Sequence, residues 1–249
     1  MLTTAIVRPE YRELLRGALL GILAVALSLV SAAALGASLL HLSGAYLPKA
    51  LLAFAAGAAL VLLALPGSHP FARMGAANQV TVARGALVAL LAALLGEHAS
   101  GATASVAVVV ASGALGLDGI DGWLARRSGT ASGFGARFDM ETDAVFVAVL
   151  SLLVWQFGKA GPWVLLSGVM RYLFAGLVTV TPRLRRPVPA TTRGKSIAVL
   201  QMFALIVALA PFCSRPASSW IAALGLLALL VSFALDVAWL LRQPVRDAP

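Results

Sequence analysis

Four aspartates with regular spacing lie in the stretch DGIDGWLARRSGTASGFGARFDMETD, residues 118–143, which holds five of the chain's ten acidic residues. Asp118 and Asp121 are three residues apart. Asp139 and Asp143 are four residues apart. Each spacing places both side chains on one face of a helix. Two such helices joined by a short loop bring all four carboxylates together, and such a cluster needs a positive charge between its members.

Oxygen-rich clusters of this kind suit magnesium, manganese or calcium. Two such ions can clamp a pyrophosphate and stabilise both the attacking and the leaving oxygens of an in-line displacement. The spacing therefore indicates metal-assisted phosphoryl chemistry. The alternative from charge alone is a solvated acidic loop capped by arginines.

Small residues accompany the aspartates on the same helical faces. Gly122 and Ala125 continue the stripe on the first helix. Gly135 lies one turn before Asp139 on the second helix. These residues leave space in which a ligand can bind, and Arg126 lies beside them as a donor for phosphate oxygen.

The pattern D-x2-D-G-x2-A-R-x8-G-x3-D-x3-D, complete here from Asp118 to Asp143, resembles the signature of the CDP-alcohol phosphatidyltransferases. The resemblance covers six spans, from about residue 78 to 241. It implies a CDP-linked lipid donor, usually CDP-diacylglycerol. An alcohol attacks its β-phosphorus, a phosphodiester forms and CMP leaves. Family members are usually homodimers.

The resemblance also assigns roles to individual residues. Two Mg²⁺ or Mn²⁺ ions would be held by the aspartates Asp118, Asp121, Asp139 and Asp143. Asp143 would in addition be the general base for the acceptor hydroxyl, since a positioned carboxylate can accept its proton. The cytidine and phosphates would contact Gly122, Ala125, Arg126 and Gly135.

The composition predicts that a membrane surrounds these residues. The chain has 249 residues, of which 60% are hydrophobic and 12% are charged, whereas a soluble domain is about one quarter charged. A spanning helix needs about 20 mostly apolar residues. Eight stretches qualify, roughly 17–40, 48–66, 80–96, 102–124, 138–157, 161–181, 195–213 and 218–241. We expect an all-α, polytopic membrane bundle, with residues 1–70 as a two-helix extension and residues 71–249 as a six-helix core.

Basic residues predict the orientation of these spans. With eight spans, fifteen of the 19 Lys and Arg residues fall on the side of both termini and the aspartates, three fall on the other side, and Arg171 lies within a span. Lys and Arg concentrate on the cytoplasmic side of membrane proteins. We therefore expect a cytoplasmic site in a bacterial inner membrane. The first span runs into ALGAS, which resembles a signal-peptide cleavage site, but its apolar run is longer than that of a typical signal peptide, so we expect an uncleaved helix. The net charge of +9 follows from topology, so nucleic acid is not expected as a partner.

Other polar residues recur inside the spans. Asn78, Thr81 and Arg84 follow one another at helical spacing. Similar residues open the first core helix of the family, which favours contact with the nucleotide or its phosphates. Ordinary helix capping with a basic anchor at the membrane interface is an equal alternative.

Three basic residues are candidates for the acceptor site. Arg171 lies within a span, where an ionisable group indicates function, although Tyr172 follows it where the glycerol-phosphate branch of the family usually has Glu. Gly194, Lys195 and Gln201 form a GK-x5-Q segment that resembles the start of the fifth core helix of phosphatidylglycerophosphate synthases. Lys195 and the preceding Arg193 can hold a phosphate there, and the alternative is a basic cytoplasmic loop attracted to anionic lipid. For Asp236, in the last span, we expect pairing or snorkelling to the membrane interface rather than catalysis.

The preferred acceptor is therefore glycerol 3-phosphate, with inositol phosphate, serine or another small alcohol as alternatives. A transporter that uses the carboxylates for a coupling cation is an alternative of a different class. Transporters tend to place such groups at the bilayer midplane within inverted repeats. The aspartates instead lie at the ends of two spans, and no repeat is evident.

Overall fold

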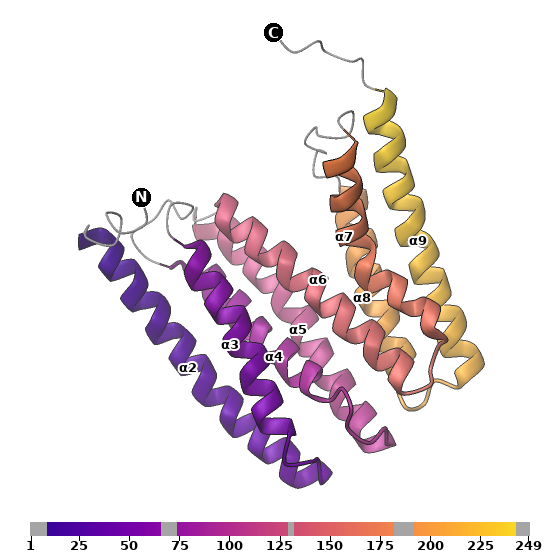
Figure 1. Ribbon diagram of the computed structural model, residues 1–249, viewed down its shortest axis with the longest axis horizontal. Helices are drawn as coiled ribbons and strands as arrows, with labels where there is room; N and C mark the ends of the chain where they lie inside the picture. The colour runs from indigo at the N-terminus through magenta and orange to yellow at the C-terminus, as the bar shows by residue number, and fades with distance from the viewer. Residues whose placement is uncertain (1–8, 66–73, 129–131, 182–191, 243–249) are drawn as a thin grey trace. The chain divides into compact units, whose positions relative to one another are not determined.

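The computed structural model describes residues 9–65, 74–128, 132–181 and 192–242, and these residues form helices and connecting turns without a strand. In chain order the helices are α2 (Pro9–Leu40), α3 (Tyr46–Ala64), α4 (Ala76–Ala93), α5 (Gly101–Ser128), α6 (Gly133–Gln156), the 3-10 helix η1 (Pro162–Val164), α7 (Leu165–Val180), α8 (Thr192–Leu209) and α9 (Arg215–Arg242) (Figure 1). The predicted all-α fold class is confirmed.

Six of the described helices are long and apolar enough to cross a membrane, namely α2, α3, α4, α5, α8 and α9. The predicted number of eight is not confirmed. In α6, the first half carries Arg137, Asp139, Glu141 and Asp143, so its uninterrupted apolar part is short. In α7 there are 16 residues, which extend about 24 Å at the helical rise of 1.5 Å, less than a hydrocarbon core of about 30 Å.

The chain forms two compact units, Met1–Phe146 and Val147–Pro249. In the first unit α2 packs on α3 and α4, α3 packs on α4, and α4 packs on α5. Of the six candidate spans, α4 buries the largest share of its residues. Alanines such as Ala86, Ala89 and Ala93 are almost fully buried in it. Small side chains let neighbouring helices approach closely where lipid supplies no hydrophobic driving force.

The outer faces of α2 and α3 are apolar. Leu20, Leu27, Leu52 and Leu63 are each at least 60% exposed. Such a surface would be unfavourable in water, whereas in a bilayer it faces acyl chains. The protein is therefore an integral membrane protein.

A buried carboxylate ties the α2–α3 turn to the α4–α5 turn. Glu97 accepts hydrogen bonds from the Ser43 backbone N–H at 2.8 Å, the Ser43 hydroxyl at 2.7 Å and Lys49 Nζ at 2.6 Å. Burial opposes ionisation of Glu97, but the hydrogen bonds from Lys49 and Ser43 outweigh it and hold the pKa of this carboxyl below its usual value. The sequence analysis did not identify this contact.

The second unit is held by close contacts around small residues. On α9, a Cβ added at Gly225 would lie 2.6 Å from Gln201 Oε1 of α8. On α7, a Cβ added at Gly168 would lie 2.7 Å from the Cα of Ala148. Both glycines are therefore sites of direct helix–helix approach. Gln201 is buried and donates from Nε2 to Ser167 Oγ at 3.0 Å.

Candidate active site

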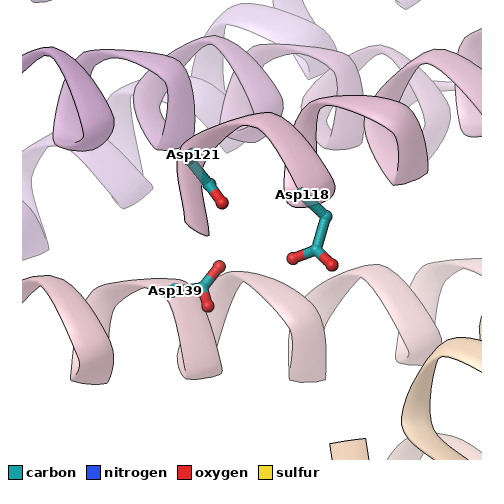
Figure 2. A group of neighbouring side chains, drawn as sticks. All are labelled: Asp118, Asp121 and Asp139. Atoms are coloured by element: carbon teal, nitrogen blue, oxygen red, sulfur yellow. The ribbon is translucent and has the colours of Figure 1, made fainter. Parts of the chain in front are cut away.

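Three of the predicted aspartates converge between α5 and α6. Asp118 and Asp121 extend from the end of α5, and Asp139 points toward them from the start of α6 (Figure 2). One carboxylate oxygen from each of the three lies within 4.8 Å of the other two. Asp121 is almost fully buried, whereas Asp118 and Asp139 are partly exposed. The predicted convergence of these residues is confirmed.

The guanidinium of Arg84, on α4, links these three aspartates and Asp143. Its Nη1 donates to Asp121 Oδ2 at 2.9 Å and to Asp139 Oδ1 at 2.5 Å. Its Nη2 lies 2.9 Å from Asp118 Oδ1 and donates to Asp143 Oδ1. Each terminal nitrogen therefore joins one carboxylate of α5 to one carboxylate of α6.

Arg84 is only 1% exposed, so it is not an interfacial anchor, which corrects one of the two interpretations drawn from the sequence. A lone arginine within an apolar span needs buried acidic partners. This rule could have predicted from the sequence that Arg84 is buried against acidic side chains. Its helical spacing from Asn78 and Thr81 was visible in the sequence, but its four partners were not.

Thr81 and Asn78 also belong to this region. The Thr81 hydroxyl lies 3.0 Å from Asp121 Oδ2 and 3.1 Å from the Ala77 carbonyl oxygen, and it can donate to either. Asn78 is buried beside α6, where a Cβ added at Gly135 would lie 2.9 Å from Asn78 Oδ1. A side chain at position 135 would therefore require the Asn78 side chain to shift.

The remaining residues of the motif lie on the last turns of α5. A Cβ added at Gly122 would lie 3.3 Å from Arg126 Nη1, so the arginine side chain extends back over the glycine. Arg126 is exposed and is free to reach a phosphate oxygen. The side chain of Ala125 lies outside the described residues.

The donor set fits a hard divalent cation. Such ions take carboxylate oxygens at about 2.0–2.6 Å, so two ligands of one ion lie at most about 4–5 Å apart. The oxygens of Asp118, Asp121 and Asp139 satisfy this limit. Oxygen ligands without nitrogen or sulfur favour magnesium, manganese or calcium over zinc or copper.

The three candidate acceptor residues all belong to the second unit. Arg171 is half-buried on α7, and Lys195 is exposed on α8. Arg193 forms an ion pair with Asp236 of α9, which confirms the predicted pairing of Asp236. The assignment of these basic residues to the acceptor stays a prediction.

The family model described as CDP-alcohol phosphatidyltransferase matches residues 74–234. The chain belongs to this family. The match includes all four aspartates, Arg84 and Thr81. No curated protein and no solved structure matched the chain.

The protein is therefore a transferase of phospholipid biosynthesis that moves a phosphatidyl group from a CDP-alcohol to another alcohol. Its family uses divalent cations, and the cluster of Asp118, Asp121 and Asp139 can hold one. The predictions of the family, of an enzyme and of membrane lipid as its surroundings are confirmed.

Proposed function

We propose that this phosphatidyltransferase uses CDP-diacylglycerol as donor and glycerol 3-phosphate as acceptor, releasing CMP. The observation that supports the proposal is the convergence of the motif's aspartates, three of which present oxygens within 4.8 Å. Inositol phosphate, serine and other small alcohols are the competing acceptors. The preference for glycerol 3-phosphate, as in a phosphatidylglycerophosphate synthase, rests on the GK-x5-Q segment that begins at Gly194.

The proposed site holds two Mg²⁺ or Mn²⁺ ions on Asp118, Asp121, Asp139 and Asp143. When bound, the ions would neutralise the pyrophosphate of the donor and polarise its phosphorus–oxygen bonds. Asp121 is buried and its Oδ2 lies within hydrogen-bond distance of the Thr81 hydroxyl, so it is suited to a fixed ligand position. A hydrogen-bond partner of this kind orients the carboxylate that binds a metal.

Asp143 is the proposed general base. Its side chain is 27% exposed, compared with 5% for Asp121, so an acceptor hydroxyl can reach it from outside the helix contacts. A carboxylate within hydrogen-bond reach of the hydroxyl takes its proton as the oxygen attacks phosphorus. Arg126, Gly122, Ala125 and Gly135 are proposed to bind the cytidine and phosphates, together with Asn78 and Thr81.

The site is proposed to face the cytoplasm of a bacterial inner membrane, because most basic residues lie on its side of the predicted spans. Residues 1–70 are proposed as an addition to the family core. The boundary between them lies within residues 66–73, outside the described residues. A homodimer is the proposed assembly.

The test is CMP release by the purified protein in detergent with CDP-diacylglycerol, Mg²⁺ and one acceptor at a time. We expect release with glycerol 3-phosphate and none with Asp143→Asn. Glu141→Gln is the matched control, because Glu141 is an exposed acidic residue on the same helix. Full activity of Asp143→Asn would remove Asp143 from the role of base. CMP release with serine or inositol phosphate, but not with glycerol 3-phosphate, would refute the proposed acceptor and leave the proposed type of reaction unchanged.

A further inference from the structure

The Arg84 guanidinium is placed where a cation shared by α5 and α6 would have to bind. All four aspartates of the motif contact it, and both terminal nitrogens bridge the two helices. The side chain is 1% exposed and comes from a third helix, α4. Its Nε is buried and has no hydrogen-bond partner among the described residues. The side chain therefore forgoes one hydrogen bond while its terminal nitrogens contact all four carboxylates.

The positive charge of Arg84 offsets part of the repulsion among the four aspartates. Four ionised carboxylates carry four negative charges, and Arg84 supplies one positive charge among them. Without a cation between them, like charges at this spacing repel and would separate the end of α5 from the start of α6. One arginine is enough to hold the carboxylates together, but it leaves an excess of negative charge that attracts divalent cations.

Arg84 and a divalent cation require the same carboxylate oxygens. Hydrogen bonds from a guanidinium occupy lone pairs of carboxylates that metal coordination also uses. We propose that Arg84 is a positioning residue that assembles the four carboxylates in the metal-free enzyme and competes with the incoming divalent cation for them. This inference rests on the proposed metal site.

The competition has two opposite consequences for a variant without the guanidinium. Arg84→Gln removes the charge that holds the metal-free cluster together, so the metal-free protein becomes less stable. It also removes the competitor, so the cation binds more tightly. A purely structural arginine would produce the first effect without the second.

The experiment measures Mn²⁺ binding to metal-free protein in detergent, without donor or acceptor, from the electron paramagnetic resonance signal of free Mn²⁺. Thermal unfolding is recorded with and without saturating Mn²⁺. For Arg84→Gln we expect a lower melting temperature without metal and a larger rise on Mn²⁺ addition than in the wild type. The dissociation constant should fall about tenfold or more, the ratio that corresponds to one charge-assisted hydrogen bond.

Arg127→Gln is the matched control for net charge. Arg127 is exposed at the end of α5 and stacks over Trp123, with its guanidinium carbon 5.0 Å from the ring centroid. This variant should bind Mn²⁺ with an affinity close to that of the wild type. Equal tightening in both variants would mean that net charge alone sets the affinity, and this would overturn the proposed competition.

Unchanged or weaker Mn²⁺ binding by folded Arg84→Gln would overturn the role of Arg84 while leaving the metal site intact. If Arg84→Gln does not fold, Arg84→Lys carries the test. A single ammonium cannot pair with both helices as the guanidinium fork does. The Mn²⁺ dissociation constant of Arg84→Lys should therefore also fall below that of the wild type, and an equal or higher value would refute the inference. Mn²⁺ binding that is absent from the wild type, or that persists undiminished in Asp121→Asn, would overturn the proposed metal site and this inference together.

Discussion

Replacing Thr81 with valine tests whether the buried hydroxyl orients Asp121 for cation binding. Valine keeps the approximate shape of threonine and removes only the hydroxyl group. In the wild type this hydroxyl lies 3.0 Å from Asp121 Oδ2. Asp121 is 4% exposed, so water cannot readily replace the lost donor. We expect Thr81→Val to require more Mg²⁺ for activity and to retain most of its rate when Mg²⁺ is saturating.

The contacts of Thr81 set the size of this effect. A hydrogen bond to a charged acceptor contributes about 1.5–3 kcal/mol. Two features of the structure favour the lower end of that range. The single hydroxyl hydrogen is shared with the Ala77 carbonyl oxygen at 3.1 Å, and Arg84 Nη1 donates to the same Asp121 oxygen at 2.9 Å. A loss of about 1.5 kcal/mol corresponds to roughly a tenfold increase in the Mg²⁺ concentration that gives half-maximal activity. Removing a hydrogen-bond partner of a metal ligand usually has an effect of this size or larger.

The assay is CMP release as a function of Mg²⁺ concentration, with saturating donor and acceptor. Thr142→Val is the matched control, because the buried Thr142 hydroxyl donates to the Phe138 carbonyl oxygen at 2.9 Å within α6. This control should keep the Mg²⁺ requirement of the wild type. The reasoning fails if Thr81→Val has the same requirement as the wild type, or if both valine variants shift equally.

Two further predictions concern stability in detergent. Gly168→Ala should lower the melting temperature, since the new Cβ would lie 2.7 Å from the Cα of Ala148 and overpacking costs about 1–3 kcal/mol. Gly176→Ala, on the same helix, is the control and should be neutral or slightly stabilising, because a Cβ added there would meet nothing within 4 Å. Equal melting temperatures for the two variants would contradict the close contact at Gly168. The ionised form of Glu97 is stabilised in the folded state, so its contribution is present above its unfolded pKa of about 4.3 and is lost as pH falls through the lower folded pKa. Thermal unfolding of wild type and Glu97→Gln should therefore differ most near neutral pH and converge once the pH has fallen below the lowered pKa of folded Glu97. A difference that does not change with pH would refute this.

The positions of the proposed metal ligands were predictable from the sequence because they depend on local geometry. The spacings from Asp118 to Asp121 and from Asp139 to Asp143 are fixed by the helical period, and the short segment between the two pairs favoured an antiparallel arrangement of their helices. The apolar stretches likewise indicated where helices form. The number of spanning helices was not predicted in the same way, since the apolar part of α6 after its charged residues, and the whole of α7, are shorter than a full span.

Contacts between distant parts of the chain were not predictable in the same way. Arg84 is separated by at least 34 residues from each of its acidic partners, and Lys49 by 48 residues from Glu97. Their pairing depends on the packing of α3 and α5 against α4, which no spacing in a single sequence specifies. The general rule that buried charges need partners indicated that such pairs exist but not which residues form them.

The contact at Glu97 constrains how a minimal form of the enzyme can be made. The family match begins at residue 74, and a shortened chain starting there would lack Ser43 and Lys49, which donate the hydrogen bonds that Glu97 accepts. Its α4–α5 turn would carry a carboxylate that has lost these three hydrogen bonds, and the face of α4 that α2 and α3 now cover would meet lipid. A workable truncation would therefore have to exchange Glu97 for a neutral residue. The two N-terminal helices and the residue at position 97 would have to be changed together.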